Sequence, residues 1–198
     1  MTRGDQPICG LLSDIASERA SPASGTAAAV VGAFGASLCE MGCIHSVGRN
    51  DPDDAGAELR DIRDDLRTQR NHLLELGARD AAVVDELFGG ACGAGQTETK
   101  RSLGVPLTTA RACLTVIELG AVVAESGTRS IVADVRAGVL FAHSGLRASV
   151  FAVRSNVKRI EDQSFVERIN RRTDTIEETA EQTAQRVTAD LERRNQPG

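Results

Sequence analysis

Three carboxylates interrupt apolar helical patterns in this sequence, and they are the residues best placed to do chemistry. Asp80 borders the apolar side of one pattern, Asp134 lies between Ile131 and Val135, and Glu40 interrupts a run of small residues. Burying a carboxylate is costly unless it is paired with a cation or used in a reaction. Spacing alone leaves both roles open for each acid. The cations that could pair with them, or anchor an anionic ligand, are Arg49, Arg147, Arg154, Lys158 and Arg159.

The patterns of nucleotide and metal sites are missing. The sequence has neither the GxGxxG fingerprint of dinucleotide-binding proteins nor a GxxxxGK[ST] phosphate loop. Cys39 and Cys43 share one helix face near His45, but no second ligand pair has zinc-site spacing, so packing is the favoured role for these thiols. The 5 cysteines include no CxxC unit, which is typical of reduced thiols in a cytoplasmic protein. We therefore expect no metal and no cofactor.

The composition limits the partners of the chain. The 198 residues carry a net charge of -5, and the 3% aromatic content includes no Trp and no Tyr. A nucleic-acid surface built on stacked aromatic rings is therefore excluded, and the negative net charge of the chain does not attract polyanions. Hydrophobic residues at 41% and charged residues at 26% are ordinary for a globular protein. We expect one domain over residues 5–194.

The hydrophobic spacing is helical throughout, and no useful strand-like alternation occurs. A short helix is predicted to end near Ala20, and Ser21-Pro22 is predicted to open the next one, with Ser as N-cap. The longer predicted helices cover about 25–46, 59–87, 106–126, 131–157 and 165–191. This pattern predicts an all-α fold, an antiparallel bundle of about six helices. Apolar seams of this length often continue across a subunit interface, so a homodimer is expected.

The segment 25–46 is long enough to cross a membrane. Its Ala and Gly residues are only weakly apolar, Glu40 falls inside it, and no basic flank follows. These features favour a buried helix whose small residues let neighbouring helices approach closely, and no membrane partner is expected.

Four short motifs follow one another along the chain: SPASGTAAA at 21–29, VPL at 105–107, Ala133-Asp134, and NVKRIED at 156–162 with Phe165. In their order they resemble the cyclodeaminase/cyclohydrolase family, which includes methenyltetrahydrofolate cyclohydrolases and the C-terminal domain of formiminotransferase cyclodeaminase. The resemblance extends from about Ile8 to Val187. It implies an all-helical dimer that acts on a folate substrate without metal or nucleotide.

The resemblance also implies roles for individual residues. Asp80 matches the family's catalytic acid. The residues that match its folate site are Pro22, Ala23, Ser24, Gly25, Thr26, Asp134, Asn156 and Asp162. Arg49, Arg154 and Lys158 are candidates to receive the anionic glutamate tail of the folate.

The implied activity is hydrolysis of 5,10-methenyltetrahydrofolate to 10-formyltetrahydrofolate. Cyclohydrolase is favoured over formiminotetrahydrofolate cyclodeaminase, which releases ammonia, because no formiminotransferase domain is attached. The family's glycines are replaced by Ala23 and Ser24, which keeps a non-catalytic helical homologue as a third alternative.

Overall fold

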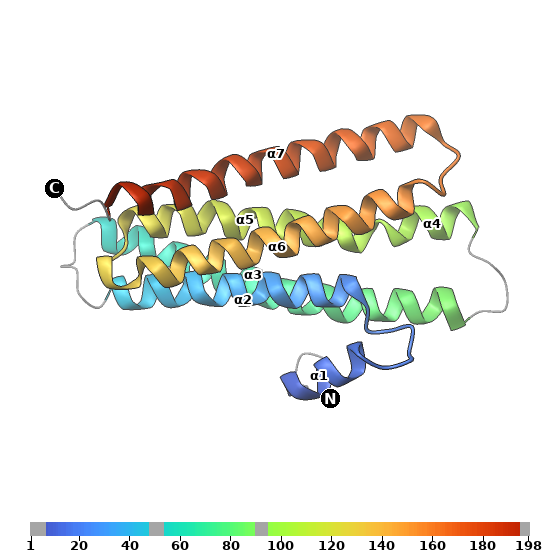
Figure 1. Ribbon diagram of the computed structural model, residues 1–198, viewed down its shortest axis with the longest axis horizontal. Coiled ribbons are helices and arrows are strands. Elements are labelled where there is room, and N and C mark those ends of the chain that lie inside the picture. Colours follow the sequence, from blue (N-terminus) through green and yellow to red (C-terminus); the bar gives the residue numbers. More distant parts are fainter. Residues whose placement is uncertain (1–6, 48–53, 90–94, 195–198) are drawn as a thin grey trace.

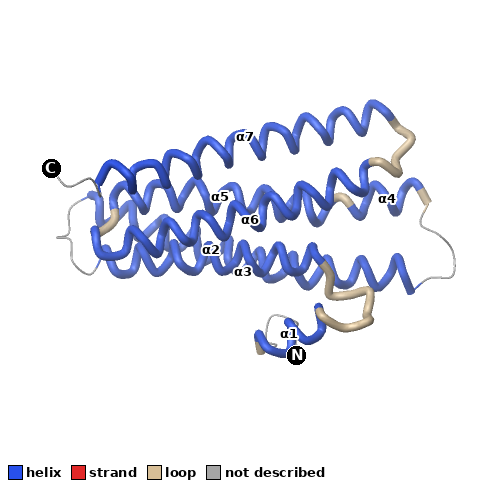
Figure 2. The backbone as a smooth tube through the Cα atoms, viewed as in Figure 1, coloured by secondary structure: helices blue, strands red, loops and turns tan. Residues whose placement is uncertain are grey.

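Long antiparallel helices make up the computed structural model, which describes residues 7–47, 54–89 and 95–194 (Figure 1). The elements are α1 (Ile8–Ile15), α2 (Ser24–Val47), α3 (Asp54–Gly89), α4 (Gln96–Ser102), α5 (Gly104–Ser126), a 3₁₀ turn (Arg129–Ile131), α6 (Val132–Val157) and α7 (Gln163–Arg194). These residues contain no strand, and loops join the helices at the two ends of the bundle (Figure 2). The prediction of an all-α fold is confirmed.

Helix α2 lies between α3 and α6 and packs extensively on both. Helix α5 packs against α6, α3 and α2, and α7 covers α5 and α6. At one end of the bundle α3 and α6 finish while α4, α5 and α7 begin, and α2 starts in the same half (Figure 1). We call this the α4 end of the bundle. The other end holds the turn between α5 and α6.

Small residues bring α2 and α6 close together, as predicted for the segment 25–46. A Cβ added at Gly35 would lie 2.5 Å from the carbonyl oxygen of Gly138, and one added at Gly145 would lie 2.7 Å from that of Ala28. Real Cβ atoms do not approach backbone this closely, so glycine is required at both positions. The thiols fit the same packing, since Cys39, Cys43 and Cys113 are all fully buried.

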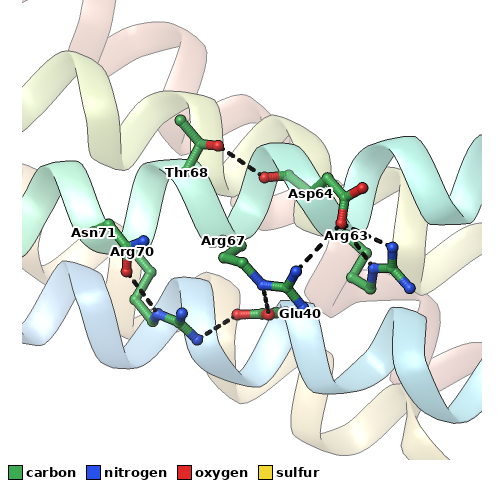
Figure 3. Close-up of polar contacts among 7 residues, drawn as sticks. All are labelled: Glu40, Arg63, Asp64, Arg67, Thr68, Arg70 and Asn71. Carbon is green, nitrogen blue, oxygen red and sulfur yellow. Dashed lines mark hydrogen bonds and ion pairs between the residues drawn. The ribbon is translucent and has the colours of Figure 1, made fainter.

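Glu40 is buried on α2 and forms an ion pair with two arginines of α3, so this contact joins α2 to α3 (Figure 3). Its Oε1 lies 2.9 Å from Arg67 Nε and its Oε2 lies 2.6 Å from a guanidinium nitrogen of Arg70. The ion-pair alternative therefore holds for Glu40, although the partners belong to α3 and are not among the cations singled out above. They were missed because helix spacing does not reveal which turn of α3 faces Glu40.

Two segments, Ser24–Val47 and Gln96–Ser126, are long and apolar enough by length and composition to cross a membrane. In each, 56% of the most apolar window is buried inside the bundle. Core helices of globular proteins pass the same test, and α2 has the buried position predicted for it.

The helix boundaries near Ser21 differ from the prediction. Helix α1 ends at Ile15 instead of near Ala20, and α2 begins at Ser24 instead of at Ser21-Pro22. The Ser21 hydroxyl does not cap α2, because it donates a hydrogen bond to the carbonyl oxygen of Ala81, 3.0 Å away on α3. Helix α4 was not predicted, since its sequence QTETKRS has no apolar periodicity.

Candidate functional site

The Asp80 carboxylate reaches from α3 to the first turn of α2. The hydroxyl of Thr26 lies 3.3 Å from Asp80 Oδ2, close enough to donate a hydrogen bond. On the other side the carboxylate lies against the Cα of Gly25, where an added Cβ would be 2.5 Å from Asp80 Oδ2. Asp80 thus occupies a recess that only a glycine leaves open.

Burial raises the pKa of Asp80, and the hydroxyl and backbone N–H of Thr26 act against that rise by donating hydrogen bonds to the carboxylate. The first turn of a helix also carries unpaired N–H groups and the positive end of its dipole, which favour an anion. The balance remains a raised pKa. A carboxylate of this kind is a stronger base than an exposed one, and general acid–base catalysis needs that property.

Two side chains fasten the start of α2 to α3 around Asp80. The Thr26 hydroxyl lies 3.1 Å from the carbonyl oxygen of Gly77, and Ser21 bonds to Ala81 one residue beyond Asp80. Ser21, Pro22 and Thr26 are buried, whereas Ser24 is exposed. The structure therefore brings the segment from Pro22 through Ala23, Ser24 and Gly25 to Thr26 together with Asp80. Ser21 was not among the predicted site residues.

Asn156 lies on the side of α6 that faces α2. It follows Gly145 by eleven residues, which is about three helical turns, so the two residues share a face. Gly145 itself contacts the backbone of α2 at Ala28 and Gly32. Asn156 is half-buried.

Arg154 and Lys158 lie on the other side of α6 and face α7. Both line an open pocket of about 490 Å³ between the two helices. Arg154 forms ion pairs with Asp174 at 2.7 Å and Glu177 at 2.8 Å, so its charge is already balanced within the chain. Lys158 is exposed. The lining of the pocket that contains these two cations does not include Asp80.

Asp162 is engaged with protein groups at the start of α7. Its carboxylate lies 2.8 Å from Lys100 Nζ and accepts hydrogen bonds from the Ser164 hydroxyl at 2.8 Å and the Phe165 N–H at 3.1 Å. These three donors lower the pKa of Asp162, with Lys100 contributing most. Asp162 therefore caps α7 and ties it to α4.

A second link strengthens this tie between α4 and the α6–α7 turn. The Gln96 amide donates to the carbonyl oxygen of Arg159 at 3.1 Å and accepts from the N–H of Glu161 at 3.2 Å. The Lys100 ammonium also lies 5.0 Å from the centre of the Phe165 ring. Gln96 and Lys100 were missed because nothing in the sequence pattern predicted a helix there.

Asp134 and Arg49 are not brought to Asp80 by the part of the chain that the structure describes. Asp134 is exposed in the first turn of α6, at the end of the bundle opposite the α4 end. It lies about 33 Å along the helix from Asn156, at 1.5 Å per residue. Arg49 lies outside the described residues. Among the residues described, no three His, Cys, Asp or Glu side chains are grouped in a way that could hold a metal ion.

Comparisons with known proteins agree on one family. The family model described as Formiminotransferase-cyclodeaminase matches residues 7–175. The chain is 31% identical to a methenyltetrahydrofolate cyclohydrolase of Methylorubrum extorquens over 177 residues, which are 83% of this chain and 85% of that protein. Its fold matches the crystal structure of a formiminotetrahydrofolate cyclodeaminase from Thermotoga maritima with a TM-score of 0.89 and 21% identity, covering 95% of this chain and 96% of that one.

Proposed function

The chain belongs to the formiminotransferase-cyclodeaminase family, and we propose that it is a methenyltetrahydrofolate cyclohydrolase. The observation that carries the proposal is the Asp80 carboxylate, held against the first turn of α2 with a raised pKa. The name of the Methylorubrum relative supports the choice of reaction.

The chemistry of the substrate requires a carboxylate of this kind. The one-carbon bridge of 5,10-methenyltetrahydrofolate is a delocalised cation between two nitrogens, and a nearby carboxylate stabilises it. Water adds to the bridge carbon while Asp80 takes a proton from that water. The bond from this carbon to N5 then breaks as N5 takes the proton held by Asp80. The hydroxyl group of the adduct loses its remaining proton to solvent as the carbonyl forms, so the carbon stays on N10 as a formyl group and one proton is released overall. A positioned general base contributes roughly 10² to 10⁴ in rate.

The surroundings of Asp80 suit a flat ring held without stacking on Tyr or Trp, neither of which the sequence contains. We propose that small side chains and backbone from Pro22 to Thr26 form one wall of the ring site, and that Asn156, which shares a face of α6 with Gly145, adds an amide to it. Lys158 is the better candidate for the anionic tail, because Arg154 already has two carboxylate partners. Every step uses water and side chains, so we propose that the reaction needs no cofactor.

The test follows loss of the methenyl absorbance above the buffer rate for the wild type and for Asp80→Asn. Asp61→Asn is the matched control, since it removes the same charge from an exposed position on the same helix. We expect Asp80→Asn to lose at least 10²-fold in kcat/KM and Asp61→Asn to stay within twofold. A wild type no faster than buffer would refute the reaction, and an active Asp80→Asn would refute the site. Running 5-formiminotetrahydrofolate in parallel distinguishes the cyclodeaminase.

The pH profile gives a second measure of the same residue. Asp80 must be deprotonated to accept a proton from water, so kcat/KM falls as the pH is lowered through its pKa. Because burial raises that pKa, the acid limb is expected at a higher pH than the ordinary aspartate value of 3.8. An acid limb at the ordinary value would contradict the buried site.

We also propose that the enzyme is a cytoplasmic homodimer formed through the exposed apolar side of α2 and α6. Five large apolar side chains on these two adjacent helices face solvent, namely Phe34, Ile44, Leu140, Phe141 and Phe151. Phe151 is 73% exposed. Several large apolar side chains left exposed on neighbouring helices are typical of an interaction site on a soluble protein. The free thiols of Cys9, Cys39, Cys43 and Cys113 support a reducing compartment.

Substitution within this α2–α6 surface tests the dimer. Phe151→Asp places a charge in the proposed interface. A control variant must be exposed, so Leu119→Asp would not serve, because Leu119 is half-buried against the core. Ala57→Asp is the suitable control, because Ala57 is exposed on α3, which lies outside the proposed interface. We expect Phe151→Asp to give a monomer by light scattering at concentrations where the wild type is a dimer. A wild-type mass that stays monomeric at every concentration would refute the dimer.

A further inference from the structure

A cationic groove runs between α3, α5 and α7, and the function proposed above does not use it. Its volume is about 960 Å³, a size typical of small-molecule sites. Arg111 lines it from α5, Arg171 and Arg172 line it from α7, and His72 lines it from α3. Glu118 is the one carboxylate among the described residues that line it. The lining therefore has an excess of positive charge, although the chain as a whole carries a net charge of -5.

The three arginines of the groove are not neutralised within the chain. No carboxylate of the described residues lies within ion-pair distance of their guanidinium groups. Other arginines on the same helices or next to them are paired. Arg154 lies 2.7 Å from Asp174, and Arg186 lies 3.8 Å from Glu125. A cleft lined by charges of one sign concentrates the electric field and attracts ions of the opposite sign, so this groove favours an anion.

The donors of the groove suit a phosphate group better than a carboxylate. Each guanidinium presents five N–H donors in a rigid plane and binds carboxylate or phosphate oxygens in pairs. A carboxylate offers two oxygens in one plane, whereas a phosphate offers oxygens in several directions. Arginines that come from two different helices therefore bind one phosphate together more easily than one carboxylate.

The groove also has an apolar part. Leu107, Leu114 and Ile176 belong to its lining. Its volume is much larger than an inorganic phosphate needs, so an organic group has room beside the anion. The combination of unpaired arginines and apolar side chains is typical of a site for an organic anion.

We propose that this groove is a second binding site, for an organic phosphate whose phosphate group is held by Arg111, Arg171 and Arg172. The apolar lining residues receive its organic part. Neither Asp80 nor Lys158 lines the groove, so this site is separate from the folate site proposed above and does not depend on the cyclohydrolase reaction. A phosphate that bridges α5 and α7 ties the two helices together, and binding therefore stabilises the fold.

The test measures the Kd of pyrophosphate by isothermal titration calorimetry with the full-length protein at constant ionic strength. Arg171→Gln/Arg172→Gln removes two cations of the groove. Arg60→Gln/Arg129→Gln is the matched control, because it removes the same charge from two exposed positions outside the lining. A hydrogen bond to a charged group corresponds to roughly a tenfold or larger change in Kd. We expect the groove variant to raise Kd at least tenfold and the control to leave it within threefold.

A third variant gives a gain of binding that misfolding cannot imitate. Glu118→Gln removes the carboxylate from the lining, so it should lower the Kd of pyrophosphate. An unchanged or higher Kd in this variant would contradict the position proposed for the anion.

Three results would overturn the proposal. If the wild type does not bind pyrophosphate, or if the groove variant and the control weaken binding equally, there is no anion site in the groove. Citrate carries a similar charge on carboxylates alone, and a citrate Kd equal to that of pyrophosphate would refute the assignment to phosphate. Displacement of pyrophosphate by 10-formyltetrahydrofolate would place the groove in the folate site and refute a second one. We expect weaker binding of citrate and no displacement.

Discussion

Adding one methyl group at Gly25 should remove activity while leaving the fold almost intact. In Gly25→Ala the new Cβ would lie 2.5 Å from Asp80 Oδ2, far inside the distance of ordinary van der Waals contact. The nearest atoms all belong to the Asp80 carboxylate, which is the end of a side chain and not backbone. The carboxylate can therefore turn away from α2, and in doing so it leaves the position proposed for catalysis.

The expected loss of stability in Gly25→Ala is much smaller than the expected loss of activity. Forcing an extra methyl group into a packed site costs about 1–3 kcal/mol, and replacing Gly by Ala in a helix returns up to about 1 kcal/mol. Rotation of Asp80 relieves most of the overlap, so a net loss of about 0–2 kcal/mol is expected. Moving a reacting group by about 1 Å costs on the order of 10²-fold in rate. Activity should fall much further than stability.

Gly104→Ala is the matched control for this substitution. Gly104 is also in the first turn of a helix, α5, and a Cβ there would meet no atom within 4 Å. Urea unfolding and kcat/KM on methenyltetrahydrofolate should be measured for both variants. Gly104→Ala should be as active as the wild type and up to about 1 kcal/mol more stable. If Gly25→Ala retains full activity, the carboxylate in this recess is not the catalytic base.

Two further predictions concern charged groups. Because Glu40 is buried whereas Arg67 and Arg70 remain 48% and 32% exposed, removing both arginines should destabilise the fold more than Glu40→Gln. In urea unfolding, Arg67→Met/Arg70→Met should lower the free energy of unfolding by about 3–5 kcal/mol, because it leaves a buried charge without a partner. Glu40→Gln should lower it by about 1–3 kcal/mol. Equal losses would contradict this asymmetry. Asp162 has a lowered pKa, so its stabilising effect is present above the ordinary value of 3.8 and is lost as the pH falls below it. The wild type should therefore exceed Asp162→Asn in stability at pH 7, and their urea midpoints should converge in acid. A pH-independent difference would refute a role for the ionised carboxylate.

The helices could be predicted because their signal is local. An apolar residue every three or four positions identifies a helix and its buried side without reference to the rest of the fold, and α3, α5, α6 and α7 follow that rule. The start of α2 could not be predicted in this way. Ser21 has the residue type of an N-cap, but its hydroxyl bonds to Ala81, which is 60 residues away in the sequence. A contact of that kind depends on how two helices are placed in register, and local spacing carries no such information.

The same limit explains which site residues the structure brings together. Residues two apart on a helix point about 200° away from each other, so Arg154 and Asn156 cannot serve the same side of α6. Asn156 faces α2 and the Asp80 region, while Arg154 faces α7 and is neutralised by Asp174 and Glu177. In sequence the two residues looked like neighbours in one basic, polar cluster. In the fold they lie on opposite sides of α6, so they cannot both belong to the ring-binding site proposed beside Asp80. Lys158 follows the last residue of α6, is exposed and, among the described residues, has no carboxylate partner of the kind that Arg154 has, which is why it is the cation proposed for the substrate tail.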